Sequence, residues 1–219
     1  MVGVVKGPVR PYDRSGRLQL SRERQVRVAE VTARLLVERG YAATTIADIA
    51  AAAQVSVPWL YKLFGPKPEL VKRAYDVLLA GDPDPVPLAV RPAFRAFATE
   101  TDPYRAVERY AAISRDLISR VGPLAAALLA AGHSAGGDVA ALAETIGRER
   151  LGGATAVSGH LADLGGLAPG VSREEARDMI WTLISPEVYR MLVVERGWSD
   201  LGYERWLAQA LKGSLLGGP

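Results

Sequence analysis

Residues 44–70, TTIADIAAAAQVSVPWLYKLFGPKPEL, constrain the fold more than any other part of this sequence. Thr45, with an acidic residue three positions later, predicts the start of a short helix. After a turn at residues 53–55, Ser56 predicts a second helix, with a proline in its first turn, that ends at Gly65. Two short helices joined by a tight turn are typical of a helix-turn-helix, a motif that lays its second helix in the major groove of DNA.

The rest of the sequence is also helical in pattern. Hydrophobic residues make up 49% of the chain, mostly Ala and Leu with few β-branched runs, which favours an all-α fold. Ser21 is expected to cap the first helix, and a Pro- and Asp-rich break divides the chain. We expect a flexible basic arm over residues 1–20, a three-helix DNA-binding domain containing the helix-turn-helix over 21–66, a connecting helix over 67–80, and a larger C-terminal helical regulatory and dimerisation domain over 81–219.

Several signals mark helices in the C-terminal part. Asp102, followed by a proline, predicts the start of a helix that runs to about Val121. Because proline is unfavourable inside a helix, a separate short helix is expected from Pro123 to Gly132. Capping serines predict three further helices, after Ser172, Ser185 and Ser199.

Charge is unevenly distributed along the chain. Residues 1–73 carry 13 Lys and Arg against 6 Asp and Glu, a balance of +7, whereas residues 74–219 carry 14 against 18, a balance of −4. A basic front part on an acidic back part is typical of a phosphate-binding module joined to another kind of domain, although a solvated charged surface gives the same count.

Composition argues against most other classes of protein. The absence of Cys excludes a disulfide framework and a Cys-ligated zinc finger, and it fits the cytoplasm. No apolar run is long enough to span a membrane, and residues 1–17 do not resemble a signal peptide. With two His and no HExxH, GxSxG or phosphate-binding Gly-rich loop, we expect no enzyme, no metal site and no cofactor.

The last helices carry more large apolar residues than one core face requires, which favours a subunit interface. A helix-turn-helix usually works as a symmetric pair, so we expect a homodimer. The residues predicted to form its interface are Met179, Leu183, Met191, Trp206, Leu207 and Leu211.

The front module resembles the DNA-binding domain of the TetR family of transcriptional repressors. The resemblance rests on Gly40-Tyr41, on residues 44–50, on Val55-Ser56, on Leu60-Tyr61-x-x-Phe64 and on Lys67-x-Glu69-Leu70. It implies that the helix beginning at Val57 enters the major groove and that Thr44, Tyr61, Lys62 and Lys67 contact DNA phosphates. The helix starts capped by Thr45 and Ser56 also present free N–H groups, which suit phosphate oxygens.

The sequence departs from the family pattern at three places. Gln54 stands where the family has glycine in the turn, and a left-handed backbone there would cost roughly 1 kcal/mol. The reading helix opens with Val57, Pro58 and Trp59, so base reading would rest on apolar contacts such as one with a thymine methyl group. Pro66 replaces the usual capping residue before Lys67.

These observations predict a homodimeric, sequence-specific regulator that binds a double-stranded DNA operator, most simply a repressor released by a small hydrophobic ligand. Candidate ligand contacts in the C-terminal domain are Phe97, Tyr110, His133 and Trp181, each of which also suits a core or an interface. The alternative is a DNA-binding dimer whose C-terminal domain only dimerises or binds a protein, without a small-molecule effector.

Overall fold

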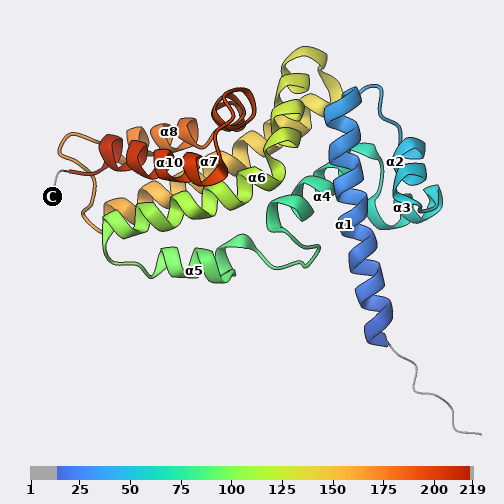
Figure 1. The fold of residues 1–219 in the computed structure, drawn as a ribbon, viewed down its shortest axis with the longest axis horizontal. Coiled ribbons are helices and arrows are strands. Elements are labelled where there is room, and N and C mark those ends of the chain that lie inside the picture. The colour runs from blue at the N-terminus through green and yellow to red at the C-terminus, as the bar shows by residue number, and fades with distance from the viewer. Residues whose placement is uncertain (1–13, 218–219) are drawn as a thin grey trace, which may run out of the picture.

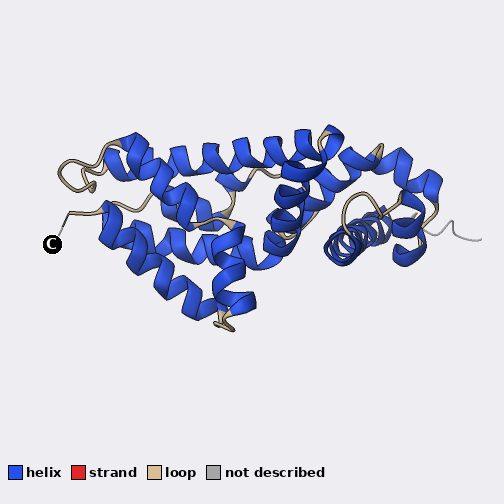
Figure 2. Cartoon of the chain, turned by 90° about the horizontal axis from the view of Figure 1, so that it is seen from above, coloured by secondary structure: helices blue, strands red, loops and turns tan. Residues whose placement is uncertain are grey.

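The computed structural model describes residues 14–217, and every element in this range is helical (Figures 1 and 2). The elements are α1 (Arg14–Arg39), α2 (Ile46–Ala53), α3 (Val57–Phe64), α4 (Lys67–Ala80), the 3₁₀ helix η1 (Leu88–Val90), α5 (Pro92–Ala98), α6 (Pro103–Ala135), α7 (Gly137–Asp163), α8 (Arg173–Leu183), α9 (Pro186–Tyr189), the π-helix η2 (Arg190–Glu195) and α10 (Asp200–Leu215). The all-α prediction is confirmed. Within the same range, no helix combines the length and the apolar character needed to cross a bilayer.

The first helix is longer than expected. It begins at Arg14 rather than after Ser21, so residues 14–20 are not a flexible arm, and residues 1–13 lie outside the described residues. Leu18 and Leu20 on this extension are 66% and 53% exposed, so packing does not hold it. The extension is rich in strong helix formers such as Arg, Leu and Gln, and its single glycine costs only about 1 kcal/mol.

The helix-turn-helix forms as the sequence predicts. Thr45 caps α2, its side chain accepting a hydrogen bond from the Asp48 N–H while the Asp48 carboxylate accepts one from the Thr45 N–H at 2.9 Å. The Ser56 hydroxyl accepts a hydrogen bond from the Trp59 N–H and caps α3. Between the two helices, Gln54 adopts φ 57° and ψ 44°, the left-handed conformation that the family pattern reserves for glycine.

We expect Gln54→Gly to stabilise the protein. Gln54 is the only residue other than glycine with a positive φ among residues 14–217, and this conformation costs about 1–2 kcal/mol for an L-residue. Part of that gain is offset by the greater freedom of glycine in the unfolded chain, so a net rise in melting temperature of roughly 2–4 °C is expected. Ala52→Gly, in the exposed last turn of α2, should lower the melting temperature and serves as the control, measured by circular dichroism.

Helix α6 corrects a second expectation. It is one continuous helix of 33 residues with Pro123 inside it, not two helices separated at that residue. Proline removes one intrahelical hydrogen bond and costs about 3 kcal/mol. The helix continues because the side chains on either side of Pro123 are buried: Val121, Leu124 and Leu128 are each at most 2% exposed.

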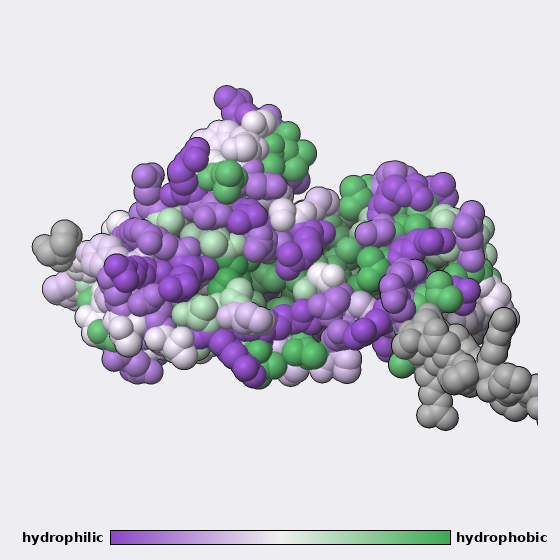
Figure 3. Space-filling view, turned by 60° about the horizontal axis from the view of Figure 1, so that its bottom comes forward, coloured by the Kyte–Doolittle hydropathy of each residue, from purple (hydrophilic) through white to green (hydrophobic). Residues whose placement is uncertain are grey.

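Two hydrophobic cores are arranged along α6. The first, here called the shared core, packs α1–α4 against the second half of α6 and the first half of α7, through Leu124, Leu128 and Ile146. The second, here called the back core, packs the first half of α6 against α7, α8 and α10. Figure 1 shows α1–α3 at one end of the molecule and α8 and α10 at the other, with α4 and α6 between them. Figure 3 shows hydrophobic residues gathered where the front helices meet the C-terminal helices.

The predicted caps of the later helices are confirmed, but part of the predicted dimer interface is wrong. Ser172, Ser185 and Ser199 cap α8, α9 and α10. Leu207 and Leu211 are 0% and 1% exposed within a single chain, because α10 packs on both α6 and α8. They belong to the back core and cannot form a surface between subunits.

The other four interface candidates are at least partly accessible to a second chain. Met179 is 38% exposed and Met191 is 45% exposed. Leu183 and Trp206 are half-buried at the edge of the back core. An interface through these four side chains stays a prediction.

Candidate nucleic-acid interface and ligand cavity

Helix α3 is amphipathic, with one face in the core and the other in solvent. Leu60 and Phe64 are buried at 0% and 3% exposure and fix the helix against the shared core. Pro58, Tyr61 and Lys62 recur at helical spacing on the opposite side and are all exposed, Tyr61 by 52%. This face carries a hydrogen-bond donor and a cation, the groups that contact phosphate.

Two other candidate readers are partly committed to packing. Val57 is half-buried, and Trp59 is also half-buried with its ring edge-on to Phe64 at 6.0 Å between centroids. The exposed face of α3 is therefore narrower than the sequence Val57-Pro58-Trp59 implies. Thr45 and Ser56 are exposed at the starts of α2 and α3. The first-turn N–H groups that the caps do not use, those of Ile46 and Ala47 in α2 and of Val57 alone in α3, remain for an anion, since Pro58 has no N–H.

Thr44 is not available as a DNA contact. It is 0% exposed, and its hydroxyl lies 2.9 Å from the Gly40 carbonyl and 3.2 Å from the Leu35 carbonyl, to which it donates. These contacts tie the end of α1 to the start of α2. The resemblance implied a phosphate contact here, whereas the hydroxyl has a structural role inside the domain.

Lys67 lies at the start of α4 with part of its side chain buried. Its ammonium donates to the Tyr41 carbonyl and lies 4.2 Å from the centroid of the Tyr41 ring. Desolvation lowers the pKa of Lys67. An ammonium has three donors, so this contact orients the group and leaves donors free for a phosphate. Sequence reasoning gave no role to Tyr41 as the partner of Lys67.

The four ligand candidates fall into two separate places. His133 and Trp181 line one open cavity of about 530 Å³ between α6, α7 and the α8–α9 connection. Phe97 and Tyr110 are each 6% exposed in the back core, where the Phe97 ring packs tilted against Tyr110 and edge-on against His160. Phe97 and Tyr110 do not line this cavity, since they pack against each other inside the domain.

The cavity also contains charged residues that sequence reasoning missed. Arg150 on α7 lines it together with Glu144 and Glu187. One Arg150 N–H donates to the Trp181 carbonyl at 3.0 Å, and the guanidinium lies 5.1 Å from the centroid of the Trp181 ring. The sequence around His133 on α6 and around the glycines on α7 does not indicate that these two helices pack against each other, because their packing depends on tertiary contacts.

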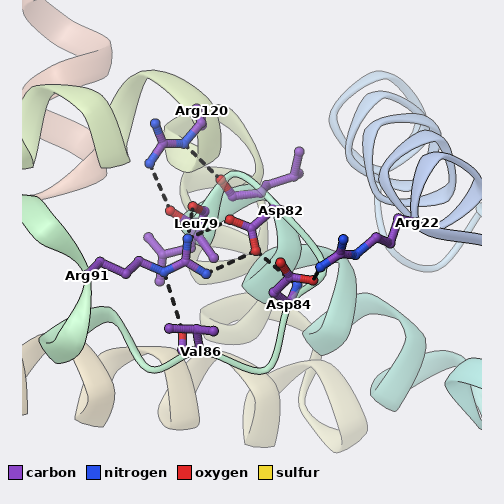
Figure 4. Close-up of polar contacts among 9 residues, drawn as sticks. Arg22, Leu79, Asp82, Asp84, Val86, Arg91 and Arg120 are labelled. Atoms are coloured by element: carbon purple, nitrogen blue, oxygen red, sulfur yellow. Dashed lines mark hydrogen bonds and ion pairs between the residues drawn. The ribbon is translucent and has the colours of Figure 1, made fainter. Parts of the chain in front are cut away.

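Two arginines from the C-terminal part bind the end of α4 (Figure 4). Arg120 on α6 donates to the Leu78 and Leu79 carbonyls at 3.1 and 3.0 Å. Arg91 donates to the Ala80 carbonyl at 3.2 Å. The last carbonyls of a helix have no intrahelical donors, so these contacts satisfy them and fix α4 to the domain behind it.

The linker after α4 is held by two ion pairs. Arg91 donates to the Asp82 carboxylate at 2.5 and 3.0 Å, which lowers the pKa of Asp82. Arg22 on α1 pairs with Asp84 in the same turn (Figure 4). Helix α1 of the front module and the linker therefore meet at one charged cluster, here called the junction. Asp82 and Asp84 are therefore both engaged in contacts that hold the linker.

Comparison with known proteins identifies the front module. Residues 29–74 match the family model of the bacterial regulatory proteins of the tetR family. No curated protein sequence matches the chain. The matched segment covers the last part of α1, all of α2 and α3, and the first part of α4. It therefore includes the exposed face of α3.

Solved structures of regulators share the whole fold. The fatty acid degradation regulator FadR of Bacillus halodurans has 16% identity and a TM-score of 0.67, covering 85% of this chain and 97% of its own. FadR of Bacillus subtilis, in complex with stearoyl-CoA, has 13% identity and a TM-score of 0.65, covering 84% and 96%. A transcriptional regulator of Saccharomonospora viridis in complex with choline has 16% identity and a TM-score of 0.64, covering 90% and 99%.

Proposed function

We propose that this chain is a tetR-family regulator that works as a homodimeric repressor of transcription. The proposal is supported by the match of residues 29–74 to the family model and by a fold like that of solved regulators. Two α3 helices would enter successive major grooves of an operator, about 34 Å apart along the DNA. The observation that carries this proposal is the exposed face of α3, with Tyr61 and Lys62 in solvent above a buried Leu60 and Phe64.

The chemistry of the contacts divides into two kinds. Tyr61, Lys62 and Lys67, with the helix starts at Thr45 and Ser56, would hold phosphates and set the register of the protein on DNA. Pro58, with the exposed parts of Val57 and Trp59, would meet base edges through apolar contacts, of which the thymine methyl group is the natural target. Sequence preference would then depend partly on DNA shape.

A small molecule bound in the C-terminal domain would release the operator. The support is the cavity of about 530 Å³, a size usual for ligand sites, and the ligands present in two regulators of the same fold, stearoyl-CoA and choline. The ligand needs only to prefer the conformation that does not bind DNA. The junction and the arginines at the end of α4 give a direct route between the cavity helices and α1.

The second candidate is a DNA-binding dimer whose C-terminal domain recognises only another chain. Its support is a set of exposed apolar side chains near the end of the chain: Met191 at 45%, Val194 at 64%, Trp198 at 39% and Leu201 at 59%. Exposed apolar residues grouped together favour a protein contact. A thermal-shift screen in which no small molecule stabilises the protein would favour this candidate.

The deciding experiment is binding to DNA fragments that flank the protein's own gene, with nonspecific competitor DNA and over a range of salt concentrations. We expect a complex that survives competitor and holds two chains per site. Binding that is weak, strongly salt-dependent and equal on all fragments would contradict sequence-specific regulation by this route.

A further inference from the structure

Arg150 in the cavity is a half-buried cation without a carboxylate partner. Among residues 14–217, fourteen ion pairs have charged atoms within 4.0 Å, and none of them includes Arg150. Its one hydrogen bond to the protein is to the Trp181 carbonyl, although a guanidinium has five donors. Charged side chains that leave bulk water are normally paired, so the remaining donors point to an anion that binds there.

The surroundings of Arg150 add a second, independent sign. Burial raises the pKa of the Tyr75, Tyr110 and Tyr203 hydroxyls, and the charge of Arg150 acts in the opposite direction on each. Tyr203 is 0% exposed, and its hydroxyl has no hydrogen-bond partner among the described residues. Buried polar atoms without partners are rare, and the charge of Arg150 acts on this hydroxyl, although Tyr203 itself does not line the cavity.

The two carboxylates of the cavity do not favour a cationic ligand. Glu144 is already paired with Arg148 at 2.5 Å, and its side chain is 71% exposed. Glu187 is exposed, and its charge acts on Arg150 only from beyond ion-pair distance. Water screens both carboxylates, whereas the half-buried guanidinium keeps most of its field. Apart from His133 and the hydroxyls of Thr182 and Ser185, the rest of the wall is apolar or small, with Leu129, Gly132, Ala140 and Ala143.

We propose that this cavity binds an amphipathic organic anion, with its carboxylate on Arg150 and its apolar body between α6 and α7. The proposal rests on the effector-responsive function proposed above and names the chemical class of that effector. The Trp181 ring, already stacked on the guanidinium, covers the head of the ligand.

The test compares three probes of equal chain length on the full-length protein: decanoate, 1-decanol and decyltrimethylammonium, all below micelle-forming concentrations. By calorimetry, we expect decanoate to bind at least about tenfold more tightly than decanol, because a charge-assisted hydrogen bond is lost in the alcohol. Binding should also change the fluorescence of Trp181, and Trp181→Phe should remove that change. Equal affinity for acid and alcohol, preference for the ammonium, or binding of none of the three would overturn the proposal.

Variants assign the effect to Arg150. Arg150→Gln should remove the preference for acid over alcohol, whereas Arg173→Gln, an exposed arginine paired with Asp163 at the start of α8, should keep it. If Arg150→Gln lowers the melting temperature too far for titration, Arg150→Lys decides. That variant keeps the charge and should retain part of the preference, whereas a complete loss of the preference in a folded protein would contradict a role for the charge at this position.

The same samples separate this proposal from the proposed function. Decanoate bound through Arg150 without weakening an operator complex would support the site and contradict release by an effector. A protein that binds no operator would contradict the regulatory function, while the ratio of acid to alcohol affinity would still decide the site.

Discussion

Replacing Leu211 with glutamate should destabilise the C-terminal domain rather than separate two subunits. Leu211 is 1% exposed in the back core, where α10 meets α6 and α8. A carboxylate there loses the packing of a leucine and buries a charge without a partner, two of the few mechanisms that cost more than about 4 kcal/mol. For a chain of this length the melting temperature should fall by roughly 10–20 °C, measured by circular dichroism.

The control lies on the same helix. Leu201 is 59% exposed in the first turn of α10, where an added carboxylate is favoured by the helix dipole. Leu201→Glu should therefore leave the melting temperature nearly unchanged. If Leu211→Glu melted like the parent protein but gave monomers by light scattering, the assignment of Leu211 to the back core would be wrong.

The second large effect is expected on DNA binding. Tyr61→Phe combined with Lys62→Ala removes a hydroxyl donor and a cation from each exposed α3 face, which would amount to four phosphate contacts in the proposed dimer. Operator affinity should fall at least about 100-fold, because hydrogen bonds to charged groups are among the stronger polar contacts. The slope of log affinity against log salt should flatten by about 1.8, for two phosphates no longer neutralised.

Lys212→Ala provides the matched control for charge. It also removes one lysine per chain, but Lys212 lies on α10 and pairs with Glu108 on α6, both in the C-terminal part of the molecule. Its salt slope should equal that of the parent protein. An unchanged slope in the α3 variant would remove Tyr61 and Lys62 from the list of phosphate contacts, and fluorescence anisotropy over a range of salt concentrations measures both.

The front module was predictable because its signals are local. Each cap at Thr45 and Ser56 requires only residues within one helical turn, and these caps set the bounds of α2 and α3. The left-handed conformation of Gln54 was indicated only by the glycine that the resembled family has at this position. The exposed side of α3 followed from its period, since Leu60 and Phe64 occupy the buried face.

Features that depend on packing between distant segments were not predictable. Pro123 predicts a break, yet burial of Val121 and Leu124 in the shared core carries α6 through it. The apolar face of α10 indicates contact with something, but the sequence cannot distinguish the same chain from a second one, so Leu207 and Leu211 were misassigned. Thr44 was misassigned because the phosphate contact that the family resemblance implies was transferred to a hydroxyl that donates to the Leu35 carbonyl on α1.

The shared core changes where this protein can be recombined with its relatives. The linker after Gly81 looks like the natural point for exchanging effector domains between regulators, but the core of the front module includes Leu124, Leu128 and Ile146, which lie well beyond it. A chimera joined at the linker would confront the front helices with a foreign surface. To combine the front helices with a different C-terminal domain, α1–α4 should therefore be transplanted together with the second half of α6 and the first half of α7.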